Sequence, residues 1–153
     1  MKRILTILAA SLVLAAAAVA QDKPNFVGTW KLSDPAQPDA FTASQIVVAQ
    51  DAGVLTVTTS GQMGEFKTTY NLDGSMGRSP LDFNGQTIDR ATKATWNGNK
   101  LTLTTSSEMN GQTFEFKSVV SLGADGSMVI ESTFPDFQGG GAPISAKATY
   151  KKA

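Results

Sequence analysis

The stretch Asn25-Phe26-Val27-Gly28-Thr29-Trp30-Lys31-Leu32 decides the fold of this chain, because it places a Gly-x-Trp sequence at the head of a first strand. The segments after it have the length and composition of short strands, rich in threonine and aromatic residues. No segment after residue 21 has a convincing helical period. The best helical candidate, residues 39–45, is too short and too polar for more than one turn. The sequence therefore predicts an all-β protein.

Hairpin turns recur along the chain downstream of this stretch. Asn-Gly and Asp-Gly pairs mark such turns because both residues tolerate positive φ. The turn pairs are Ala52-Gly53, Asp73-Gly74, Asn84-Gly85, Asn97-Gly98, Asn110-Gly111 and Asp125-Gly126. Between them, apolar and polar residues alternate with a period of two, which is typical of strands with one buried face. We expect strands at 26–32, 44–50, 54–59, 65–72, 79–83 (the weakest pattern), 88–97, 100–106, 113–122, 127–134 and 144–151.

An internal repeat indicates how these strands are connected. The first copy comprises residues 54–59, 65–67 and 73–76, and the second comprises residues 100–105, 115–117 and 125–128. A duplicated three-strand meander favours a closed up-and-down barrel over a Greek-key sandwich. We expect a single antiparallel β-barrel of eight to ten strands, closed by pairing of 26–32 with 144–151.

The first twenty residues have the features of an export signal. Lys2 and Arg3 precede an apolar, alanine-rich run, and Ala18-Val19-Ala20 is the small-x-small pattern that signal peptidase cuts. A membrane anchor would need about 20 strongly apolar residues, and this run is shorter and weaker. We expect residues 1–20 to be a signal peptide cleaved between Ala20 and Gln21. Residues 21–153 would then form one domain in the periplasm or outside the cell.

The composition excludes several kinds of chemistry. The chain contains no cysteine and no histidine. Their absence removes Ser-His-Asp and Cys-His catalysis, zinc sites built on imidazole or thiolate, and thiol redox chemistry. The strand carboxylates Glu65, Glu115 and Glu131 are predicted on the outer face, so no acid–base pair is expected inside. We expect a protein that is not an enzyme and holds no metal or cofactor.

The net charge limits the kinds of partner that the protein can bind. Loss of residues 1–20 removes two basic residues and no acidic one, which leaves a net charge of −2. Such a balance offers no electrostatic footprint for nucleic acid. Without cysteine the product cannot carry a lipid-modified N-terminal cysteine, so we expect it not to be membrane-embedded. We expect a monomer, and a protein partner remains open.

In several short motifs the chain resembles the calycin group, which comprises the lipocalins and the fatty-acid-binding proteins. Residues 26–32 are similar to the first strand of fatty-acid-binding proteins, and Ala148-Thr149-Tyr150-Lys151-Lys152 resembles their last strand. Residues 70–74, 94–101 and 122–126 resemble exported bacterial lipocalin-like proteins of unassigned function. The resemblance spans residues 26–152 and implies a calycin barrel.

The chain departs from the fatty-acid carriers where their function resides. Two positions before Tyr150, where the carriers have an arginine for the ligand carboxylate, this chain has Ala148. The carriers also have a helical lid after the first strand, whereas residues 33–39 contain two prolines and are not expected to supply one. The resemblance therefore implies the barrel rather than fatty-acid carriage.

Strand phasing defines a candidate binding site. The apolar face of each strand must line the interior, and its middle positions, at Thr68, Ser118, Ser132, Ala146 and Ala148, are small. Two readings stay open, because an eight-stranded barrel is wide enough for either. The small residues leave a cavity for a small, mainly apolar ligand, or they make room for aromatic rings in a filled core. The candidate residues of the interior and portal are Trp30, Phe66, Thr68, Tyr70, Arg90, Trp96, Phe114, Phe116, Ser118, Ile130, Ser132 and Tyr150.

In the filled-core reading, the protein is a structural or interaction module that acts through its surface or loop tips. Met63, Met109 and Phe137 lie on glycine-rich loops, which favours a portal or contact surface. Alternatively, these side chains fold back and plug the barrel. Arg90 also has more than one reading. It holds an anionic ligand head, stacks over Trp30 to close the barrel, or belongs to a solvated strand end.

Overall fold

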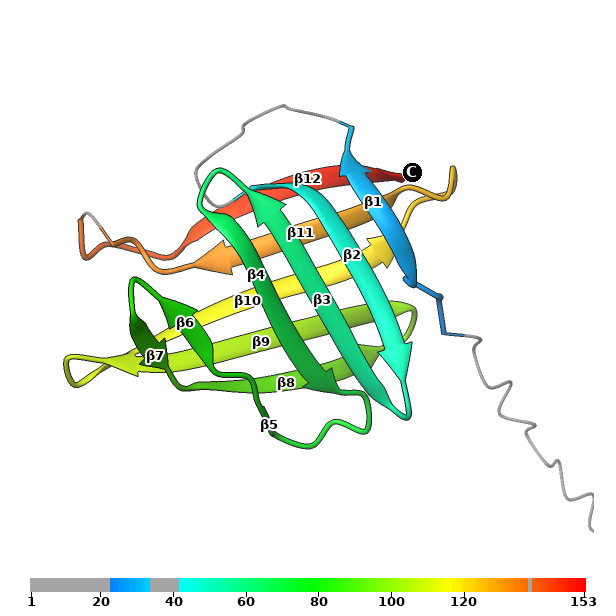
Figure 1. Ribbon diagram of the computed structural model, residues 1–153. Coiled ribbons are helices and arrows are strands. Elements are labelled where there is room, and N and C mark those ends of the chain that lie inside the picture. Colours follow the sequence, from blue (N-terminus) through cyan, green and yellow to red (C-terminus); the bar gives the residue numbers. More distant parts are fainter. Residues whose placement is uncertain (1–22, 34–41, 138) are drawn as a thin grey trace, which may run out of the picture.

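The computed structural model describes residues 23–33, 42–137 and 139–153, and over these the regular structure is strand alone. Figure 1 shows the strands wrapped into a barrel. In chain order they are β1 (Gly28–Leu32), β2 (Ala43–Asp51), β3 (Val54–Gly61), β4 (Gly64–Asn71), β5 (Gly77–Arg78), β6 (Leu81–Phe83), β7 (Gln86–Ile88), β8 (Arg90–Asn97), β9 (Lys100–Met109), β10 (Gln112–Leu122), β11 (Met128–Phe134) and β12 (Ile144–Lys152). The expected signal peptide at 1–20 and the lid position at 34–39 lie outside the described residues.

Within the described residues, ten strands form one antiparallel sheet in the order β4-β3-β2-β1-β12-β11-β10-β9-β8-β5. Strands β1 to β4 and β8 to β12 each pair with the next strand in the chain, so the barrel is up-and-down as the repeat predicts. The expected pairing of the chain ends is confirmed, since Trp30 of β1 lies opposite Lys152 of β12 and Leu32 lies opposite Tyr150.

The barrel closes at a seam that the sequence analysis does not place. Strands β4 and β8 are the facing edges of the sheet, and no backbone ladder joins them in the described part of the chain. Short β5 pairs with β8 and fills part of the seam, with Gly77 opposite Thr92. The pairing of β1 with β12 joins the two halves of the sheet. The expectation that it closes the barrel is incomplete, because the remaining edge is closed by side chains.

The segment between β4 and β8 also differs from the prediction. Residues 79–83 were expected to form one strand and residues 88–97 another, whereas the structure has β5, β6 and β7 ahead of β8. Pro80 separates β5 from β6, and proline cannot donate the backbone hydrogen bond that a continuous ladder needs. Strands β6 and β7 pair as a separate hairpin around Asn84-Gly85, where Asn84 has a φ of 50°.

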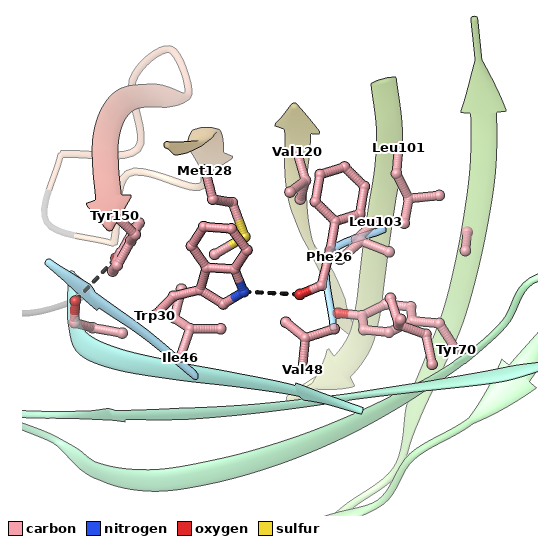
Figure 2. Close-up of a cluster of buried hydrophobic side chains, with 13 residues drawn as sticks. Phe26, Trp30, Ile46, Val48, Tyr70, Leu101, Leu103, Val120, Met128 and Tyr150 are labelled. Atoms are coloured by element: carbon pink, nitrogen blue, oxygen red, sulfur yellow. Dashed lines mark hydrogen bonds between the residues drawn. The ribbon is translucent and has the colours of Figure 1, made fainter. Parts of the chain in front are cut away.

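One end of the barrel is filled by aromatic side chains. Figure 2 shows Trp30 inside the barrel, where it is 2% exposed and its indole Nε1 donates a 2.8 Å hydrogen bond to the carbonyl oxygen of Phe26. The Phe26 ring stacks on Trp96 at 6.1 Å between centroids. The Lys152 ammonium lies 5.5 Å from the Trp30 ring centroid. Lys152, rather than Arg90, lies over Trp30, so of the three readings of Arg90 the one that stacks it over Trp30 is wrong.

The Gly-x-Trp sequence is explained by the same contact. Gly28 has a φ of 140°, and a Cβ atom at this position would lie 2.7 Å from Cε of Lys152. Any other residue would be strained here and would push away the lysine that covers Trp30. Gly28 therefore leaves room for the Lys152 side chain over the buried tryptophan.

Candidate functional site

The middle of the barrel is hollow. Two cavities with volumes of about 180 and 200 Å³ lie inside it. They share four lining residues, Ser118, Ile130, Ser132 and Tyr150, so the two cavities adjoin, and we call them the two lobes of the hollow. The first lobe is otherwise lined by Phe26, Ala43, Ile46, Val48, Leu55, Val57, Thr59, Thr68, Tyr70, Leu101, Leu103, Val120 and Met128. The second is otherwise lined by Thr42, Phe116, Lys117, Thr133, Phe134, Ala146 and Ala148.

The small mid-strand residues are the reason for this space. Thr68 lines the first lobe, Ser118 and Ser132 line both, and Ala146 and Ala148 line the second. Across the β10–β11 ladder, Ser118 lies opposite Ser132, and across the β11–β12 ladder Ser132 lies opposite Ala146. Small side chains therefore meet in register on three neighbouring strands. Trp30, Phe26 and Trp96 fill one end of the barrel and leave this space open.

The inward-facing polar side chains of the hollow carry hydroxyls. Ser118 and Ser132 share a hydrogen bond of 3.2 Å between their Oγ atoms. The Tyr70 hydroxyl shares a 3.0 Å hydrogen bond with Thr105 Oγ1, and Tyr150 donates to the carbonyl oxygen of Ala43 at 2.9 Å. Burial raises the pKa of Tyr70, and its hydrogen bond to Thr105 and the charge of Arg90 oppose this only in part. The phenol therefore stays neutral at physiological pH.

The Arg90 side chain makes hydrogen bonds across the seam between β4 and β8. Its Nε donates to the carbonyl oxygen of Ser79 at 2.8 Å, and its Nη2 donates to the carbonyl oxygen of Lys67 at 3.1 Å. Burial lowers the pKa of Arg90, and the interaction with Tyr70 opposes that shift. Arg90 is not among the residues that line either lobe.

The structure brings together part of the predicted site. Seven of the twelve candidates line the hollow, namely Thr68, Tyr70, Phe116, Ser118, Ile130, Ser132 and Tyr150. Trp30 and Trp96 lie toward the filled end, whereas Phe66 and Phe114 contact rings at the rim. Sequence reasoning missed apolar residues of β3 and β9, including Leu55, Val57, Leu101 and Leu103. The period-two pattern of residues 54–59 and 100–106 carried the signal that could have found them.

Aromatic rings meet at the rim of the barrel where the β6–β7 hairpin and the β9–β10 turn lie, at the left of Figure 1. Phe137, 46% exposed, lies 5.4 Å from the Phe114 ring and 6.0 Å from the Phe116 ring, measured between centroids. On the β4 side, Phe66 lies 6.3 Å from Phe83 of the β6–β7 hairpin. Met63 of the β3–β4 turn is 44% exposed. Phe137 thus both contacts the rim of the barrel and remains accessible from outside.

The aspartates of two hairpin turns accept hydrogen bonds from serines of the same turns. Asp73 accepts hydrogen bonds from the backbone nitrogen and hydroxyl of Ser75, and Asp125 accepts the same pair from Ser127. These hydrogen bonds lower the pKa of both carboxyls. Among the described residues, no group of three acidic side chains is placed to hold a metal ion. The described part of the chain also has no helix long and apolar enough to cross a membrane.

Comparison with known proteins supports the fold. No family model and no curated protein matches the chain. Among solved structures, a mutant of the fluorescent protein UnaG is similar with a TM-score of 0.52 and 19% identity, over 84% of this chain and 96% of that one. Secretory abundant heat soluble protein 4 from Ramazzottius varieornatus is similar with a TM-score of 0.51 and 17% identity, over 83% and 94%. At such identities the likeness shows the fold alone.

The topology and these structures together define the fold of the protein. It has a lipocalin-like fold of the calycin type, an antiparallel up-and-down barrel. This agrees with the resemblance of residues 26–32 and 148–152 to the terminal strands of that group.

Proposed function

We propose that this chain is an exported lipocalin-like binding protein that holds a small, mainly apolar molecule inside its barrel. The observation that carries the proposal is the hollow between β10, β11 and β12, where Ser118, Ser132, Ala146 and Ala148 stand in place of larger side chains. Ligand sites are typically concave and mostly apolar, with a few placed polar groups. The hollow fits that description.

The size of the hollow limits the ligand. Each lobe is below the roughly 300 Å³ at the lower end of pockets for drug-sized ligands. Each is nevertheless larger than the engineered apolar cavity of about 150 Å³ that binds benzene. The lobes therefore suit a small ring compound in one lobe, or a slim molecule that extends through both. The driving force would be burial of apolar ligand surface, about 25 cal/mol per Å².

Entry is proposed at the rim, past the loops that carry Met63, Met109 and Phe137. The exposure of Met63 and Phe137 and the ring contacts of Phe137 with β10 support this route. Methionine and a glycine-rich loop adapt to ligands of different shape. The protein would then transport or sequester its ligand without catalysis.

Export is proposed from the features of residues 1–20. N-terminal sequencing of the protein isolated from its host should give Gln21 as the first residue, with the protein in the envelope or the medium. Intact Met1 on a protein retained in the cytoplasm would contradict export. It would leave the binding proposal standing.

The direct test of binding is native mass spectrometry of protein purified from its own host, followed by extraction of whatever co-purifies. We expect an adduct of a small molecule that is lost in the Ser132→Phe variant. An empty barrel, together with tryptophan fluorescence that does not respond to lipids, hydrophobic dyes or quinones, would refute the proposal. A protein captured from envelope extract in that case would favour the interaction module.

A further inference from the structure

The hollow has a polar centre that carries no charge. Ser118 and Ser132 line both lobes, so their hydroxyls lie where the lobes adjoin. Within the described part of the chain, the hydrogen bond that each hydroxyl makes is the one they share. A pair of hydroxyls has two protons to donate and several lone pairs. Their mutual hydrogen bond uses one proton and one lone pair, so one donor and further acceptors remain for a ligand.

The charged side chains near the interior are turned away or engaged. Lys117 is the charged residue among those lining the second lobe, and it is exposed on the outer phase of β10, beside inward-facing Ser118. The Arg90 guanidinium donates to the carbonyl oxygens of Ser79 and Lys67 at the seam. Neither Lys117 nor Arg90, among the described residues, therefore presents its cation to the Ser118–Ser132 pair, where it would pair with a buried carboxylate.

Resting on the proposed function, we propose that the ligand is an uncharged, slim apolar molecule with one hydroxyl or carbonyl group, which the Ser118–Ser132 pair binds. Burying an unpaired carboxylate costs far more than burying a hydroxyl that finds a hydrogen bond. The barrel therefore selects alcohols, aldehydes, ketones or esters over the corresponding acids. The hydroxyl of Tyr70 does not take this role because it is already bonded to Thr105.

The experiment uses the mature protein loaded with 1-aminoanthracene, a small uncharged fluorescent dye, which is displaced by n-octane, 1-octanol or octanoate at pH 7. We expect the affinity of 1-octanol, measured by displacement of the dye, to be about threefold to tenfold higher than that of n-octane. This is the range for one neutral hydrogen bond. We expect octanoate to be at least about tenfold weaker than 1-octanol, since its charge is unpaired inside.

Matched variants identify the anchor. In the Ser118→Ala/Ser132→Ala double variant, the affinity of 1-octanol should fall to that of n-octane or below it, because its hydroxyl is then buried without a partner, while the affinity of n-octane is unchanged. Ser121→Ala, on the opposite face of β10, should leave all three affinities unchanged. Thr68→Val removes a hydroxyl from the first lobe only and should preserve the preference for 1-octanol.

The outcomes separate this inference from the proposed function. Octanoate that binds as tightly as 1-octanol, or a preference for 1-octanol that survives the double variant or is lost in Thr68→Val instead, overturns the inference alone. In those cases the dye and n-octane still bind, and the binding function stands. Failure of the dye and all three probes to bind overturns both.

Discussion

Arg90 on β8 donates a hydrogen bond from Nη2 to the backbone carbonyl of Lys67 on β4, 3.1 Å across the seam where the sheet has no ladder. Two further side chains complete the seam at Thr69, two residues further along β4. The Thr69 nitrogen donates to Ser79 Oγ at 3.2 Å, and Thr92 Oγ1 donates to the Thr69 carbonyl at 2.8 Å. Side chains thus satisfy backbone groups that a neighbouring strand would satisfy in a complete ladder.

The first prediction concerns Thr92, which is fully buried. Thr92→Val keeps the shape but leaves the Thr69 carbonyl without its partner. We expect a loss of about 1–3 kcal/mol in the free energy of unfolding, the cost of an unsatisfied buried group. Urea unfolding measures it, and Thr95→Val, exposed on the same strand, is the matched control with a change near zero. Equal midpoints for the two variants would show that the seam is not held by this bond.

The second prediction concerns Trp30 at the filled end. Trp30→Ala should reduce the free energy of unfolding by about 3–5 kcal/mol, the range for a large buried aromatic residue. Trp30→Phe keeps most of the apolar volume and loses the hydrogen bond to Phe26, so its loss should be clearly smaller. Guanidinium chloride unfolding measures both. An unchanged midpoint for Trp30→Ala would contradict the placement of Trp30 in the core.

The third prediction concerns pH. Hydrogen bonds from Ser75 and Ser127 lower the pKa of Asp73 and Asp125 in the folded state. A folded pKa below the unfolded one means that these turns stabilise the fold above the unfolded value of about 3.9. That stabilisation is lost as the pH falls through the folded pKa. Carboxyl titration by NMR should show both values depressed, and Ser75→Ala should raise that of Asp73 without affecting Asp125. A titration of Asp73 that Ser75→Ala leaves unchanged would contradict this assignment.

The fourth prediction concerns the rim and rests on the proposed route of entry. Phe137→Ala removes the ring that contacts Phe114 and Phe116. We expect 1-aminoanthracene to bind and leave several-fold faster, with a smaller change in affinity, because a gating residue affects both rates. Stopped-flow fluorescence measures this, and Met76→Ala, exposed on another loop, is the control. Unchanged rates would place the entrance elsewhere.

Much of the fold could be predicted because local patterns specify it. Asn84-Gly85 and Asn110-Gly111 form the turns where they were expected, and the positive φ of both asparagines shows why that residue pair marks them. The seam could not be predicted in the same way. Its bonds join Thr69 to Ser79 and Thr92 through side chains, and no periodicity encodes such contacts.

The sequence predicts which residues of the site face the interior, but it does not predict the volume between them. Alternation places Ser118 and Ser132 inward, since period two fixes the face of every residue on a strand. Whether they leave space depends on rings that come from elsewhere in the chain. Phe26 precedes β1, yet its ring packs inside against Trp96 at the filled end. That placement depends on the tertiary structure, so the sequence left both the hollow and the filled readings open.

The central claim is that the middle of the barrel is an open binding space. A fluorescence titration of the Ala148→Phe variant with 1-aminoanthracene tests it most directly, with Lys147→Phe, exposed at the neighbouring position of β12, as the control. We expect Ala148→Phe to lose less than the roughly 1–3 kcal/mol of folding free energy that an overpacked core loses, and no longer to bind the dye. Lys147→Phe should bind it as the unmodified protein does. A severely destabilised Ala148→Phe variant, or one that is folded and binds the dye normally, would contradict the account.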